Sequence, residues 1–165
     1  MLSFLKKRRI LKAASAIASD ITPRVADSRE WLKACQVDET PRSLVEAAIG
    51  QLCVIHKSVL AQTKDEDIRS TILPMIHENF QAEYCQLASA AGMNQQGLVQ
   101  LVARRLATYD SLMDSSLPDW QLRLSEQLFE CISGKRADIA LATIPGILFL
   151  SRAKAYSEFL GQILP

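Results

Sequence analysis

Several short motifs that announce an enzyme are missing from this sequence of 165 residues. Its 6 glycines are scattered, so there is no glycine-rich loop to hold a phosphate and no G-x-S-x-G turn to present a serine nucleophile. No two carboxylates stand one helical turn apart on an apolar face, where they would act as acid and base. These absences disfavour an enzyme, and no cofactor is indicated.

Paired cysteines and an excess of charge of one sign are also missing. The 4 cysteines include no C-x-x-C pair, which is neither a zinc-finger spacing nor the disulfide framework of a small secreted domain. Isolated cysteines usually act as small buried hydrophobes in a reducing compartment, so we expect a cytoplasmic protein. The net charge of +1 gives no global field that favours nucleic acid or an acidic partner.

Apolar residues recur at helical spacing through most of the chain, and no strand-like alternation accompanies them. The pattern predicts helices over residues 23–36, 41–62, 65–91, 94–113 and 118–133, followed by a long C-terminal helix. Thr22-Pro23 and Thr40-Pro41 each place a hydroxyl at an N-cap and a proline in the first turn. Pro74 lies inside its predicted helix and indicates a kink or a break there. The fold class is therefore all-α, a compact single-domain bundle of six to eight helices.

The longest stretch without a charged residue is Ile139 to Ser151, interrupted only by Pro145-Gly146. At about 13 residues it is shorter than the roughly 20 that span a bilayer as a helix. We expect it to form a kinked apolar helix that is covered on nearly all sides. In this interpretation the other helices of the bundle gather around this C-terminal helix.

The first 21 residues have the pattern of a basic amphipathic helix, which precedes the helical bundle domain of residues 22–165. No acidic residue occurs before Asp20. Three interpretations stay open: a helix docked on the core, a helix on an anionic membrane surface, and an organellar presequence. The residues predicted to contact a membrane or a partner are Phe4, Leu5, Lys6, Lys7, Arg8 and Arg9.

The predicted helix over residues 41–62 has the widest apolar stripe, from which Glu46, Lys57 and Gln62 are expected to face away. His56 lies within that stripe, three residues after Cys53. If this helix packs against the next one, the two side chains and His77 would converge and could hold zinc. A buried histidine that is hydrogen-bonded within the core explains the same pattern, so these three are candidates only and no metal is predicted.

Residues 86–106, QLASAAGMNQQGLVQLVARRL, resemble the helix-turn-helix of bacterial transcription regulators, in particular the AraC-like form. Ala88 matches the small residue between the two helices, Gly92 the left-handed turn and Met93 the apolar turn residue. The resemblance implies a second helix that reads bases in the major groove. On that helix the outward residues would be Gln95, Gln96, Gln100 and Arg104.

Two functional classes follow from these patterns. The first is a non-enzymatic interaction or adaptor protein, which binds a protein partner or a second copy of itself through an apolar helix face. Such a protein would be cytoplasmic, and its basic N-terminus would allow it to be peripheral to a membrane. The alternative is a helix-turn-helix regulator that binds DNA through residues 86–106.

Overall fold

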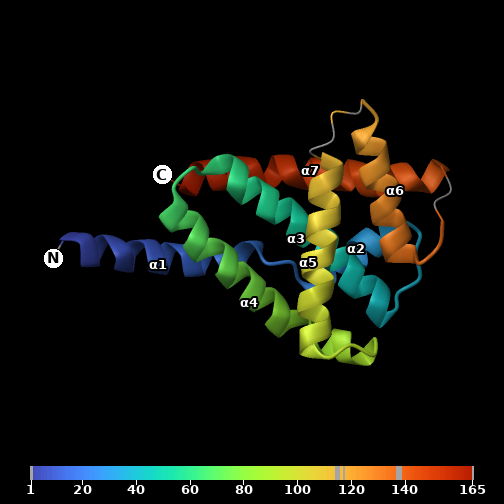
Figure 1. Ribbon diagram of the computed structural model, residues 1–165, viewed down its shortest axis with the longest axis horizontal. Coiled ribbons are helices and arrows are strands. Elements are labelled where there is room, and N and C mark those ends of the chain that lie inside the picture. Colours follow the sequence, from blue (N-terminus) through green and yellow to red (C-terminus); the bar gives the residue numbers. More distant parts are fainter. Residues whose placement is uncertain (1, 114–115, 117, 137–138, 165) are drawn as a thin grey trace.

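The computed structural model describes residues 2–113, 116, 118–136 and 139–164; for residues 2–7, 9, 10, 13, 139 and 140 only the backbone is described. These residues form seven α-helices in a compact all-α bundle (Figure 1). The helices are α1 (Leu2–Ile21), α2 (Val25–Ala34), α3 (Pro41–Gln62), α4 (Glu66–Ala90), α5 (Gln95–Met113), α6 (Trp120–Ser133) and α7 (Ile139–Ile163).

Most helix ends lie where the capping residues predict them. The Thr40 hydroxyl accepts a hydrogen bond from the Ser43 amide at the start of α3, and Asp65 caps α4 by accepting from Asp67 and Ile68. Gly92 and Gly134 follow the last turns of α4 and α6 with φ of +79° and +68°, a conformation that other residues rarely adopt.

The predicted cap at Thr22 is wrong. The Thr22 hydroxyl donates to the carbonyl oxygen of Ala18 at 2.5 Å, so it closes the end of α1 instead of starting α2. The N-cap of α2 is Arg24, two residues later, whose amide donates to the side chain of Asp27. A hydroxyl next to a proline fits the end of one helix as well as the start of the next, because both expose unpaired backbone groups.

The centre of the bundle is α3, which packs against α2, α4, α5, α6 and α7. Most of its residues are buried, from Leu44 to Val59. The prediction that the C-terminal helix is central is therefore wrong, because α7 packs chiefly against α3 and α6. Both helices are strongly apolar, and only the positions of their neighbours distinguish them.

Neither internal proline ends its helix. Pro74 lies inside α4 and Pro145 inside α7, and both helices continue without interruption. The break predicted at Pro74 is thus wrong, while the kinks predicted at the two prolines stay predictions. Removal of one backbone hydrogen bond is tolerated when the rest of a long helix is held by packing.

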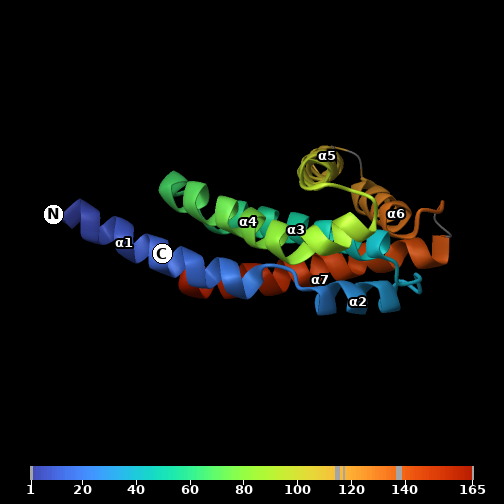
Figure 2. The ribbon, with the colours of Figure 1, turned by 90° about the horizontal axis from the view of Figure 1, so that it is seen from below.

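α7, one of the two longest helices, runs along the bundle, and α5 and α6 run roughly crosswise to it (Figure 1). Of these two, α6 packs against α7, whereas α5 packs against α3, α4 and α6. In both views the first turns of α1 extend beyond the other helices (Figures 1 and 2). Its second half packs against α4 through Ala14, Ile17, Ala18 and Ile21, which are buried. By length and composition α3 would be able to cross a membrane, but 78% of the apolar window is buried in the bundle, as in the core helix of a globular protein.

Candidate interaction site

An apolar groove of about 210 Å³ lies between α6 and the N-terminal half of α7. Trp120, Leu122 and Leu124 line it from α6, and Ile147 and Leu150 from α7. The exposed fraction of Ile147 is 64%, the highest among the large hydrophobic side chains that the structure describes as exposed. Leu122 and Leu150 are also exposed, so three large apolar side chains border one groove. Three exposed large apolar side chains around one groove make it a candidate interaction site.

The floor of the groove is made by a close approach of α6 to α7. A Cβ atom on Gly146 would lie 2.8 Å from both Cβ and Oγ of Ser125, so only glycine fits there without displacement. The Ser125 hydroxyl accepts from the Gly146 amide at 2.7 Å and donates to the Ala142 carbonyl. That carbonyl lies four residues before Gly146, so the hydroxyl bridges the two groups that an undisturbed helix would pair directly.

From its composition, the apolar stretch Ile139 to Ser151 was expected to be covered on nearly all sides. The structure shows that this expectation is wrong. Ala142, Gly146 and Phe149 are buried against the bundle, whereas Ile147 and Leu150 face solvent. A stretch without charge has no polar face that would tell the buried side from the exposed one. The exposed half of this stretch is the part of the groove that α7 contributes.

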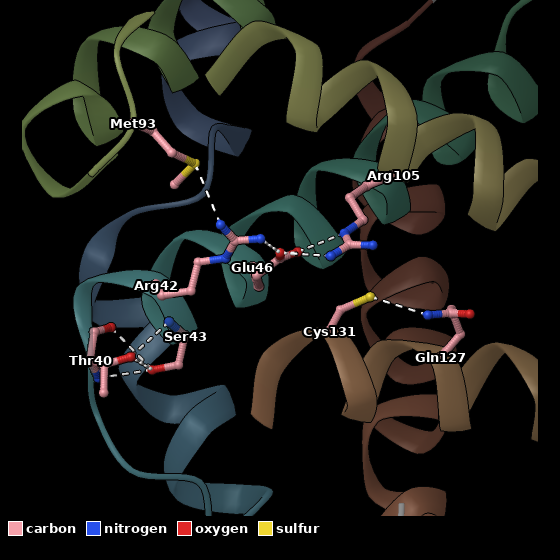
Figure 3. A network of polar contacts seen from close by, with 8 residues as sticks. All are labelled: Thr40, Arg42, Ser43, Glu46, Met93, Arg105, Gln127 and Cys131. Carbon is pink, nitrogen blue, oxygen red and sulfur yellow. Dashed lines mark hydrogen bonds and ion pairs between the residues drawn. The ribbon is translucent and has the colours of Figure 1, made fainter. Parts of the chain in front are cut away.

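A larger cleft of about 470 Å³ lies beside a buried ion-pair network centred on Glu46. Arg105 from α5 donates twice to this carboxylate, from Nε at 2.9 Å and from Nη2 at 2.8 Å, and Arg42 donates from Nη2 at 2.8 Å (Figure 3). The carboxylate is fully buried, while the side chains of Arg105 and Arg42 are 21% and 50% exposed. The prediction that Glu46 faces away from the core is thus wrong.

This network ties helices together and has no free carboxylate for chemistry. Three N–H donors occupy the two oxygens of Glu46, so it is not available as a general base. The hydrogen bonds from Arg105 also raise the pKa of that guanidinium, which keeps its charge. Cys131 lines the same cleft and accepts from Gln127 Nε2 at 3.3 Å. The ion-pair network beside this cleft is therefore a structural joint between α3 and α5.

His56 on α3 and His77 on α4 do meet across the helix interface. Their ring centroids are 5.9 Å apart with perpendicular planes. Burial lowers the pKa of both imidazoles, and for His77 the neighbouring His56 lowers it further. Lys57 and Asp110, paired at 2.8 Å, stand close enough to His56 to influence its pKa in opposite directions.

The histidine pair predicts a loss of stability in mild acid. Because folding lowers both pKa values, the folded chain binds fewer protons than the unfolded chain just below pH 6.5. The free energy of unfolding should therefore be highest above that pH and fall as the pH drops towards 5. Urea denaturation of a His56→Gln/His77→Gln double variant should show a flatter pH dependence than the parent; equal slopes would contradict the prediction.

The three candidate metal ligands are not brought together as a site. Burial, followed by the charge of Asp110, raises the pKa of Cys53 to about 12, so this thiol keeps its proton, whereas zinc binds the thiolate. Among the side chains that the structure describes, no group of three or more His, Cys, Asp or Glu residues is placed to hold a metal ion. The three suggested ligands are thus two half-buried imidazoles, those of His56 and His77, and the buried thiol of Cys53.

The residues that would read DNA share an exposed face of α5. Gln95, Gln96, Gln100 and Arg104 are all exposed, and Ala88 is buried at the turn between α4 and α5. The preceding helix, however, is the uninterrupted 25-residue α4, which is far longer than the first helix of a helix-turn-helix. DNA binding stays a prediction.

The residues predicted to contact a membrane lie on the first turns of α1. The side chains of Phe4, Leu5, Lys6, Lys7 and Arg9 lie outside the described residues. Arg8 is exposed, as are Leu11 and Lys12 one turn later. The membrane contact also stays a prediction.

Sequence patterns did not locate the groove between α6 and α7, because its exposed apolar residues come from two different helices. Ile147 and Leu150 on α7, which border the same groove, lie 25 and 28 positions after Leu122 in the chain. No protein-family model matches this chain, and no match to it was found among curated proteins or solved structures.

Proposed function

We propose that the protein is a non-enzymatic interaction protein, which binds an apolar helix of another polypeptide in the groove between α6 and α7. The observation that carries the proposal is the exposure of Leu122, Ile147 and Leu150 around one apolar groove. An amphipathic helix with apolar residues at positions i, i+4 and i+7 presents an apolar stripe that could pack against these side chains.

Two further features support this function. The surface of the groove is mostly apolar, so affinity there would come chiefly from removal of apolar surface from water. The cleft beside the ion-pair network holds a carboxylate that three N–H donors already occupy, so this carboxylate offers no unpaired acceptor to a ligand.

A photo-crosslinking experiment tests the proposal. With p-benzoylphenylalanine in place of Ile147 in the full chain, irradiation of cells should yield a defined crosslinked protein product. The same residue in place of Val99, an exposed apolar side chain on α5, serves as the matched control and should not yield that product. Leu122→Asp should reduce the product at Ile147 about tenfold or more, because a charge in an apolar interface disrupts the contact.

The outcome separates site-specific binding from random contact. Leu122 is exposed, so Leu122→Asp should leave the thermal unfolding of the chain nearly unchanged. Identical products at positions 147 and 99, or a product that survives Leu122→Asp, would contradict the proposed function.

A further inference from the structure

The positive charges of the chain are concentrated near its N-terminus. Five of the 19 lysines and arginines lie between Lys6 and Lys12, and none of the 18 aspartates and glutamates precedes Asp20. The remainder of the chain therefore holds 14 basic residues against all 18 acidic ones, which gives it a net negative charge. A net charge of +1 for the whole chain thus combines a cationic first half of α1 with an acidic remainder.

The fold sets this cationic segment apart from the rest of the bundle. The second half of α1 packs against α4, whereas its first turns extend beyond the other helices in both views (Figures 1 and 2). The side chains of Arg8 and Lys12 are exposed. A large charged surface can therefore reach this end of α1 ahead of the other helices.

Apolar surface accompanies the charges on this part of α1. Leu11, one turn after Arg8, is 52% exposed. It lines an open groove between α1 and α4 together with Arg8, Lys12 and Met75. The side chains that the structure describes along this groove include two cations and no carboxylate. An exposed leucine among cations is typical of a helix that lies on an anionic membrane surface.

The apolar component favours a lipid surface over nucleic acid. Both are polyanions that attract a cluster of lysines and arginines. An exposed leucine gains little against a phosphate backbone, whereas in the headgroup region of a bilayer it is removed from water. The sequence places further apolar residues before and among the cations: Leu2, Phe4, Leu5 and Ile10.

We propose that the first half of α1 binds the surface of an anionic phospholipid bilayer, with Arg8 and Lys12 at the headgroup phosphates and Leu11 inserted among them. The same surface repels the acidic remainder of the chain, so the molecule is held by this end. The α6–α7 groove lies at the opposite end of the bundle (Figures 1 and 2). Membrane binding does not require a partner in that groove, so it stands apart from the proposed function.

Co-sedimentation of the full chain with vesicles tests this binding. The parent should pellet with vesicles that contain about 30 mol% phosphatidylglycerol and stay in solution with pure phosphatidylcholine. Each cation near an anionic surface raises the partition coefficient about fivefold, so loss of four should lower it about a hundredfold or more. The variant that removes four consecutive cations of α1 is Lys6→Gln/Lys7→Gln/Arg8→Gln/Arg9→Gln.

A matched control removes the same amount of charge elsewhere. It replaces four exposed cations on α2, α5, α7 and the loop after α6: Lys33→Gln/Arg104→Gln/Lys135→Gln/Lys154→Gln. This variant has the same net charge as the first one but should bind vesicles nearly as the parent does, because charges more than a Debye length from the surface are screened. Circular dichroism should show the helicity of the parent for both variants.

Tryptophan at position 11 tests which part of the molecule meets the lipid. Leu11→Trp should shift its fluorescence emission to shorter wavelength on anionic vesicles, since the indole ring leaves water for the membrane interface. Leu122→Trp, at the opposite end of the bundle, should show no such shift. The native Trp31 and Trp120 are present in both variants, so a difference between them belongs to the introduced ring.

Three results would overturn the inference. The first is a parent chain that stays in solution with anionic vesicles at low salt, and the second is equal binding by the two four-cation variants. The third is retardation of random duplex DNA by a chain whose tryptophan at position 11 shows no shift on vesicles, which would identify nucleic acid as the polyanion. None of these results changes crosslinking at position 147, so they leave the proposed function standing.

Discussion

Replacing Glu46 by alanine is expected to lower the free energy of unfolding by about 3 kcal/mol. The substitution removes a fully buried carboxylate and leaves Arg105, whose side chain is only 21% exposed, without its partner. An unpaired guanidinium in that position loses its hydration without any compensating bond. The value lies at the low end for buried pairs because Arg42 is half exposed and can turn to water.

The measurement is urea denaturation of the parent and the variant, with equal slopes required for the comparison. Glu39→Ala is the matched control, because this carboxylate forms one exposed ion pair with Arg29 at 2.9 Å and should matter by less than about 1 kcal/mol. Joint replacement of Glu46 and Arg105 by methionine should be milder than Glu46→Ala alone, since no charge is left buried. A loss no larger than that of Glu39→Ala would show that the network does not hold α3 to α5.

Gly146→Ala is expected to destabilise the fold by about 1–2 kcal/mol, although alanine is the better helix former. The helix preference of alanine over glycine favours the variant by about 1 kcal/mol. Against it stands a Cβ atom placed 2.8 Å from Cβ and Oγ of Ser125. Overpacking of this kind typically costs about 1–3 kcal/mol, and Cβ of Ser125 cannot rotate away as the end of a long side chain would. The steric effect therefore outweighs the helix preference.

A double-mutant cycle with Ser125→Gly separates the two effects. In the Ser125→Gly background the obstructing Cβ and Oγ are absent, so Gly146→Ala should become neutral or stabilising. Urea denaturation of the four chains gives the coupling energy directly. The same destabilisation in both backgrounds would mean that the contact between α6 and α7 does not explain the glycine.

The helices and most of their ends were predictable because the signals for them are local. The residue pattern predicts a helix over residues 41–62 with its N-cap at Thr40. The structure confirms both, because α3 spans Pro41–Gln62 and is capped by Thr40. Gly92 and Gly134 similarly stop their helices through their own backbone preference. The wrong prediction of an N-cap at Thr22 also has a local origin. Its hydroxyl could pair with the end of α1 or with the start of α2, and in the structure it pairs with the end of α1.

The burial of Glu46 and its ion pair with Arg105 could not be predicted from neighbouring residues in the sequence. Arg42 lies one turn earlier on the same helix, which indicates only an exposed pair of neighbouring charges. The residue that buries this carboxylate is Arg105, 59 positions away on another helix. A charged residue next to an apolar stripe looks solvated until a distant partner is known to lie above it.

By itself the sequence determined an all-α chain, the positions of its helices and the apolar character of the C-terminal one, because hydrophobic periodicity and capping act within a few residues. Only the tertiary structure decided that α3 and not α7 is central, that Glu46 is buried and that Leu122 and Ile147 border one groove. Helices with similar apolar faces compete for the same neighbours. Their arrangement follows from close packing between segments far apart in the chain, which no stretch of sequence records on its own.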